Sequence, residues 1–165
     1  MATELEGEKT GRGVRVAIAV SRFNENLTLR LLEGALMACQ QGDVQNDDLT
    51  IAWAPGSFEL PTIAAELAKT GRHDVIVCLG VVIKGETAHF EHVSEQAAAG
   101  IAAVSRESGV PVMFGVLTAY TEQQAVDRSG GLLGNRGYDV TVAGIEMANV
   151  MRKVRAGQSE LPEMG

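Results

Sequence analysis

The stretch of residues 80–90 joins an apolar run to a glycine turn and a histidine. Residues 75–83 are apolar and largely β-branched, which is typical of a buried parallel strand. Gly85 follows the run and allows the backbone to approach a ligand closely, and free amides at the start of the next helical pattern favour an anion. His89 stands at that junction and has a side chain that exchanges protons near neutral pH. The stretch therefore predicts a proton-transfer group beside an anion pocket.

The histidines also have simpler interpretations. His89 is alternatively a histidine that starts a helix and bonds only within its own turn. His92 follows one turn later, and a His-x-x-His pair suggests a metal, but the spacing indicates no third ligand and we expect no metal. His73 precedes a strand pattern, and we expect it at the surface.

Two further side chains are candidates for binding a flat, phosphorylated ligand. Arg128 ends a short helical pattern, and arginine makes planar, bidentate contacts with phosphate. The alternative is a solvated arginine at a helix C-terminus. Phe23 lies in a polar loop, where it is able to stack on a flat ring or to act as a hydrophobic staple for the next helix.

Glu59 and Phe114 have equally open interpretations. Glu59 lies at the start of a helical pattern. There it either accepts hydrogen bonds from a polyol or is simply a first-turn carboxylate that the helix dipole stabilises. Phe114 lies within a strand pattern, and by default we expect it in the core.

Composition narrows the class of protein. The chain has 165 residues, 45% of them hydrophobic, which fits one globular domain. The net charge of −7 and the 4% aromatic content argue against a nucleic-acid partner. The N-terminus is polar and the apolar runs are short, so we expect no signal peptide, no membrane span and a cytoplasmic location. Cys39 and Cys78 lie in apolar patterns and are expected to be core thiols.

Strand and helix patterns alternate along residues 14–155, the predicted domain. Strands are expected at residues 14–20, 49–53, 74–83 and 111–117. Helices are expected after a cap at Asn24 or Asn26, after a cap at Ser57, and over residues 89–107, 121–128 and 138–155. Residues 1–13 are expected to form a mobile arm, or one that orders on a neighbouring subunit, and residues 156–165 a flexible tail.

This alternation predicts an α/β fold with right-handed crossovers. We expect a three-layer αβα sandwich of flavodoxin-like type with a central four-stranded parallel sheet. Ligands bind such sheets beyond the carboxyl ends of the strands. The four loops at that edge begin at Ser21, Pro55, Lys84 and Thr118, so we expect the candidate residues to share one site.

Six motifs in order resemble one family. They are Ser21-Arg22-Phe23-Asn24, residues 55–61 (PGSFELP), residues 80–90, residues 114–118 (FGVLT), Gln124-Ala125 with Arg128, and Gly134-Asn135-Arg136-Gly137. Together they resemble 6,7-dimethyl-8-ribityllumazine synthase over about residues 14–155. The resemblance implies the penultimate step of riboflavin synthesis, in which 5-amino-6-(D-ribitylamino)uracil condenses with 3,4-dihydroxy-2-butanone 4-phosphate and releases phosphate and water. It implies no cofactor.

The resemblance also implies a role for each site residue. Phe23 would stack on the pyrimidine, while Phe114 would close the site from a neighbouring subunit. The ribityl chain would be held by Ser57, Phe58 and Glu59, and the uracil edge by the backbone of Val81, Val82 and Ile83. The phosphate would be bound by Glu86, Thr87 and Arg128. His89 would donate and accept protons.

Family members form pentamers, and many assemble a sixty-subunit icosahedral shell, so the resemblance implies a homo-oligomer. The chain departs from the family pattern at Tyr120, where an acidic residue is usual, at Gln123 in place of Glu, and at Gly131-Leu132 in place of Thr-Lys. Two other classes of protein stay open: a flavodoxin-like binding module without turnover, and a shell-forming container whose catalysis is incidental.

Overall fold

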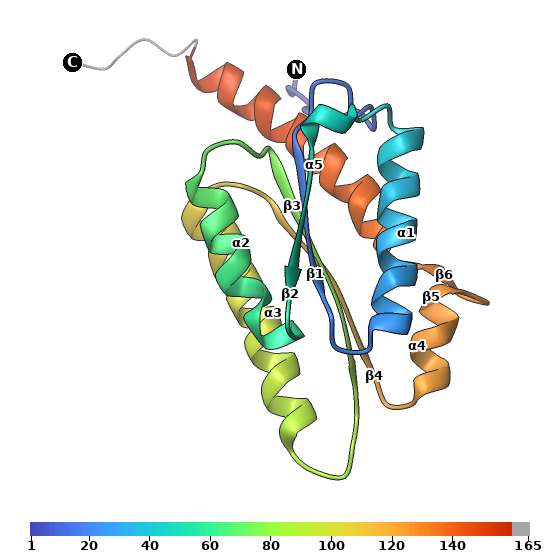
Figure 1. Ribbon diagram of the computed structural model, residues 1–165. Coiled ribbons are helices and arrows are strands. Elements are labelled where there is room, and N and C mark those ends of the chain that lie inside the picture. The colour runs from blue at the N-terminus through green and yellow to red at the C-terminus, as the bar shows by residue number, and fades with distance from the viewer. Residues whose placement is uncertain (160–165) are drawn as a thin grey trace.

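The computed structural model describes residues 1–159, which form a three-layer αβα sandwich (Figure 1). Its central sheet contains β1 (Val16–Ser21), β2 (Leu49–Ala54), β3 (Val75–Ile83) and β4 (Val112–Ala119). The strands are all parallel, in the order β2-β1-β3-β4. The flavodoxin-like sandwich and the four-stranded parallel sheet predicted from the alternation are therefore confirmed.

Helices cover both faces of this sheet. Helix α1 (Glu25–Gln41) and helix α5 (Arg136–Ser159) pack together on one face, while α2 (Leu60–Lys69) and α3 (His89–Ser108) pack on the other (Figure 1). The short helix α4 (Glu122–Arg128) follows β4 near α1. Strands β1 and β3 lie between these layers, and every side chain from Val75 to Val82 is buried. Burial on both faces explains why this strand is a continuous apolar run and does not alternate with polar residues.

Three short elements were not expected. A 3₁₀ turn, η1 (Asn46–Asp48), precedes β2, and another, η2 (Ser57–Glu59), precedes α2. The glycine-rich bend contains an antiparallel ribbon of β5 (Ser129–Gly131) and β6 (Gly134–Asn135). Helix α5 extends to Ser159, four residues beyond its predicted end. The other residues of the expected tail, 160–165, lie outside the described part of the chain. The short elements were not predicted because their glycine-containing and polar sequences show no hydrophobic periodicity.

One predicted helix cap is wrong, and the other has the right position but makes no side-chain cap bond. Ser57 does not cap α2, because η2 intervenes and its Oγ is buried without a hydrogen-bond partner. Asn24 occupies the N-cap position of α1, but its side chain makes no cap bond. Its backbone is left-handed, with φ of 59°, a conformation that asparagine tolerates better than most residues. The Ser57 side chain lines the candidate cavity, whereas the Asn24 side chain bonds to β3.

His73 is buried, so the expectation of a surface residue is wrong. Burial, with smaller contributions from the charges of Arg72 and Arg15, lowers its pKa. The next residue, Asp74, accepts hydrogen bonds from the Arg15 side chain and forms ion pairs with Arg15 and Arg152, at 3.0 and 2.9 Å. Burial raises the pKa of Asp74, but its bonds to Arg15 and the charge of Arg152 together lower it below its ordinary value.

The N-terminal arm lies against α5 of its own chain. Asn149 Nδ2 donates to the backbone oxygens of Glu8 and Thr10, at 2.7 and 2.8 Å, and Arg152 donates to Gly13 O at 2.7 Å. Gly7 is close enough to Glu146 O that a Cβ there would collide with it. Residues 7–13 thus run alongside α5. The mobility of the arm stays a prediction.

Candidate functional site

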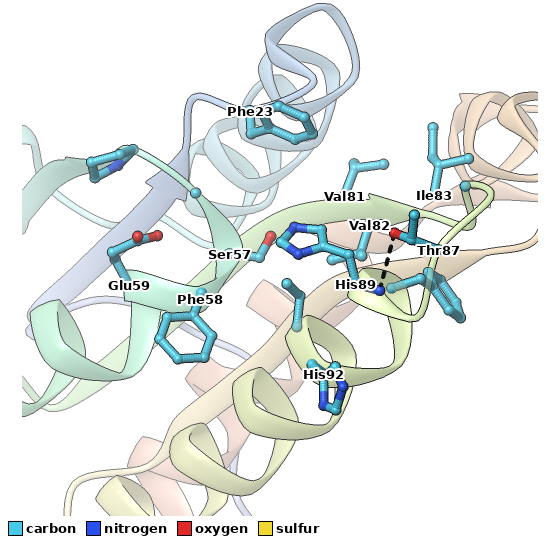
Figure 2. Close-up of a pocket in the computed structure, with 15 residues that line it drawn as sticks. Phe23, Ser57, Phe58, Glu59, Val81, Val82, Ile83, Thr87, His89 and His92 are labelled. Atoms are coloured by element: carbon cyan, nitrogen blue, oxygen red, sulfur yellow. Dashed lines mark hydrogen bonds between the residues drawn. The ribbon is translucent and has the colours of Figure 1, made fainter.

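A cavity of about 650 Å³ opens at the carboxyl edge of the sheet, where η2 and the first turns of α3 line it. Three of the loops expected there contribute to it: the β1–α1 loop, the turn η2 and the β3–α3 loop (Figure 2). Two aromatic rings flank it with most of their surface exposed, Phe23 at 70% and Phe58 at 56%. Exposed rings beside a hollow are typical of a ligand site.

Phe23 is held by the backbone that continues from β1. The Arg22 and Phe23 amides donate to the carbonyl oxygens of Ala54 and Pro55, at 2.8 and 3.1 Å. Asn24 Nδ2 then donates to Val81 O at 2.9 Å. The loop is thereby tied to the loop that follows β2 and to β3. Phe23 is presented to the cavity from a fixed backbone, as a residue that stacks on a planar ligand requires.

The turn η2 fits into a space that Gly80 leaves open. Ser57 is 5% exposed, and a Cβ placed on Gly80 would collide with Ser57 Oγ. Leu60, at the start of α2, would also be close, since its Cδ1 lies 3.3 Å from that position. The absence of a side chain at Gly80 therefore allows η2 to approach the carboxyl end of β3 at Val81 and Val82.

His89 is the first residue of α3, and its ring points into the cavity toward Ser57 (Figure 2). Its amide donates to Thr87 Oγ1 at 3.4 Å. Residues 84–88, between β3 and α3, are exposed, and a Cβ on Gly85 would meet no atom within 4 Å. A helix start with this much open space beside it leaves amide groups accessible to an anion. The geometry is able to bring a proton-transfer group next to a bound anion.

The structure brings most of the candidate residues to one cavity, but not all of them. The nine candidates that line it are Phe23, Ser57, Phe58, Glu59, Val81, Val82, Ile83, Thr87 and His89. Glu86 is exposed in the β3–α3 loop but is outside the lining. Phe114 is on β4 and 40% exposed, so it is not a core residue. Arg128 ends α4, where its Nη1 donates to Gln124 O at 3.0 Å. The fourth loop is therefore not part of the cavity within one chain.

Six more residues line the cavity: Pro55, Gly56, Gly85, Phe90, His92 and Val93. The first three belong to the glycine-containing turns that the sequence had indicated. The other three share the first turns of α3 with His89. Helix spacing is the signal for His92 and Val93, since residues three and four positions after an inward-facing residue lie on its face. It gives no signal for Phe90, which directly follows His89.

Metal and thiol chemistry find no support in the described residues. Within residues 1–159, no three His, Cys, Asp or Glu side chains converge in the manner of a metal site. Cys39 and Cys78 are buried, as expected. Burial raises the pKa of Cys39 to about 11 and that of Cys78 to about 12, so neither supplies a thiolate near neutral pH. In the same part of the chain, no helix is long and apolar enough to cross a bilayer.

Comparison with protein families gives a match that covers most of the chain. The family model of 6,7-dimethyl-8-ribityllumazine synthase, a transferase of riboflavin biosynthesis, matches residues 13–152. The match spans the whole sheet, the cavity and most of α5. It agrees with the resemblance of the six motifs. The chain belongs to the 6,7-dimethyl-8-ribityllumazine synthase family.

Proposed function

We propose that this chain condenses 5-amino-6-(D-ribitylamino)uracil with 3,4-dihydroxy-2-butanone 4-phosphate to form 6,7-dimethyl-8-ribityllumazine, phosphate and water. The single observation that carries the proposal is the position of His89 at the start of α3, with its ring in a cavity that also contains an exposed phenylalanine and a strand edge. The reaction needs the same parts: a surface for a flat ring, a polar lining for a polyol, an anion site and a proton shuttle.

The pyrimidine substrate would lie between Phe23 and the strand edge. The Phe23 ring would stack on the heterocycle, and the backbone of residues 81–83, at the carboxyl end of β3, would contact the uracil edge. Ser57 Oγ is buried without a hydrogen-bond partner among residues 1–159, and a ribityl hydroxyl would satisfy it. Glu59 would accept further hydroxyl hydrogen bonds. These contacts hold one substrate in register with the other, which is where much of the rate would come from.

The phosphate of the second substrate would lie at the β3–α3 loop. Glu86 and Thr87 are exposed just before the start of α3, and their amides, with the Thr87 hydroxyl, would bind the phosphate. Attack of the amine on the ketone gives a carbinolamine that must lose water, and His89 would move the protons. Elimination of phosphate needs positive charge to stabilise the leaving group, which a helix start supplies only in part.

Arg128 would supply that charge from a neighbouring copy. Within one chain it ends α4, on the side of the sheet that carries α1, and its guanidinium bonds its own helix. Phe114 likewise lies outside the cavity lining, on edge strand β4. We therefore propose a homo-oligomer with the site at its subunit interface, a pentamer or a sixty-subunit shell of pentamers. The cytoplasmic location also stays a prediction.

The condensation is tested by mixing the purified chain with both substrates. Lumazine absorbance and inorganic phosphate are followed together against the uncatalysed mixture. Equal rates of both products, well above background and lost when either substrate is omitted, support the proposal. A rate equal to background contradicts it and favours a binding module without turnover.

The shared site is tested by complementation. His89→Ala and Arg128→Ala variants are mixed, unfolded and refolded together, and the native mass of each sample is measured. Mixed oligomers should contain some sites with both residues intact, so activity should exceed that of either variant refolded alone. Oligomers that mix without any gain in activity would place both residues in the same chain's site.

A further inference from the structure

The β3–α3 loop, residues 84–88, must hold a fixed shape if its amides are to bind phosphate, yet little packs against it. All five residues are exposed. The Lys84 amide donates to Ala119 O at 2.9 Å, which ties the start of the loop to β4. Exposed segments with few packed neighbours open at a low cost in free energy. The far end of the loop therefore needs a separate support.

Tyr120 contacts residues at both ends of this loop. Its ring centroid is 6.0 Å from that of Phe90, with an angle of 42° between the ring planes. Lys84 Nζ lies 5.6 Å from the centroid of the same Tyr120 ring. Both distances are within the range in which aromatic pairs and cation–π pairs attract. Lys84 begins the loop and Phe90 follows His89, so a single side chain joins the two ends.

The backbone of Tyr120 is itself well anchored. It directly follows β4, whose Ala119 pairs with Ile83 of β3. The Tyr120 amide donates to Gln124 Oε1 at 2.9 Å, and the Gln124 amide donates to Thr121 Oγ1 at 3.1 Å, which caps α4. The ring is nevertheless 68% exposed, so burial in the core does not explain a tyrosine here. Its contacts with Lys84 and Phe90 do.

We propose that Tyr120 is a positioning residue that clamps residues 84–90 in the shape that binds phosphate. The identity of the phosphate ligand rests on the proposed function, whereas the clamp does not. Tyr120 occupies a position where the resemblance implies an acidic residue. In this chain an aromatic ring would hold Lys84 and the first turn of α3 together, and so fix the direction of the His89 side chain.

The test uses two variants of the full chain, Tyr120→Ala and Tyr120→Phe. Hydrogen–deuterium exchange is measured for residues 84–90, with and without inorganic phosphate, and residues 75–82 of β3 serve as an internal reference. Loss of the ring contact should speed exchange of the loop about fivefold in Tyr120→Ala. Tyr120→Phe keeps the ring and should match the wild-type chain. Phosphate should slow the exchange less in Tyr120→Ala than in the other two.

Kinetics supply the second readout. Tyr120→Ala should raise KM for the butanone phosphate several-fold, leave KM for the pyrimidine unchanged, and be rescued by Tyr120→Phe. Unchanged loop exchange in Tyr120→Ala would overturn the clamp. Faster exchange with unaltered protection by phosphate would overturn its role in positioning. If the wild-type chain forms no lumazine, the proposed function fails, while the exchange with inorganic phosphate still decides for or against the clamp.

Discussion

Gly80 offers the sharpest test of how the cavity is built. It lies on the central strand β3 beneath Ser57, and a methyl group there would collide with Ser57 Oγ and lie 3.3 Å from both Ser57 Cβ and Leu60 Cδ1. Overpacking of this kind costs about 1–3 kcal/mol. Gly80→Ala should therefore lower the free energy of unfolding by about that amount, and lower the melting temperature by about 2–4 °C for each kcal/mol.

The same geometry predicts that Ser57→Ala relieves most of the cost. Ser57 Oγ is buried and has no hydrogen-bond partner among the described residues, so its removal alone should not lower the free energy of unfolding. In the Ser57→Ala background, the colliding atom is gone and Gly80→Ala should cost less than about 1 kcal/mol. The two substitutions should then show a coupling energy of about 1 kcal/mol or more.

The assay is urea unfolding of the four proteins of this double-mutant cycle, at one protein concentration because an oligomer's stability depends on it. The folded variants are also tested for lumazine formation. Gly80→Ala should raise KM for the pyrimidine, because η2 carries Ser57 and Glu59 away from the strand. An equal cost of Gly80→Ala with serine or alanine at position 57 would refute the reasoning.

Three other predictions follow from single residues. Asn24→Ala should lower the free energy of unfolding in urea by about 1–2 kcal/mol, since it removes the bond to Val81 O and strains a left-handed backbone. Asn24→Gly should avoid the strain but should not restore the hydrogen bond. Arg128→Ala should weaken binding of the butanone phosphate and leave the pyrimidine unaffected in calorimetric titrations, and equal loss for both ligands would count against its role. Stability should fall as pH drops below about 6.5, because the lowered pKa of His73 lets the unfolded state take up the proton first. It should fall again below about pH 4, because the carboxylate of Asp74, whose folded pKa is lowered, is protonated more readily in the unfolded state. His73→Gln should remove the first decline and Asp74→Asn the second, and retention of both declines in urea unfolding series would contradict these assignments.

The sequence predicted the parallel sheet well because the physical signal is local. A strand buried on both faces must be apolar throughout, and the run at residues 75–83 has no other simple interpretation. Nine of the candidate residues share the cavity because the carboxyl ends of parallel strands meet at one edge. Those parts of the fold follow from period and topology alone.

What the sequence did not predict depends on tertiary contacts. Ser57 was predicted as a helix cap because serine is common at that position. It instead begins η2, and its side chain occupies the space that Gly80 leaves open. Asn24 donates to a strand 57 residues away in the sequence, and no local pattern encodes such a partner. His73 precedes a strand, yet it is buried against the rest of the fold. Arg128 and Phe114 lie outside the cavity lining. We propose that a neighbouring subunit supplies them, and the periodicity of one chain carries no signal of such an arrangement.

The role that we propose for His89 is proton transfer, and His92 is the matched control. Both imidazoles line the cavity, one helical turn apart on α3. Turnover of lumazine formation would be compared for wild type, His89→Ala and His92→Ala with both substrates saturating. We expect the turnover rate of His89→Ala to fall about 10- to 100-fold, because proton transfer is impaired while positioning survives. The turnover rate of His92→Ala should change by less than about threefold, because this residue would contact the ligand without transferring a proton. Equal losses in the two variants, or a larger loss in His92→Ala, would contradict the assignment of proton transfer to His89.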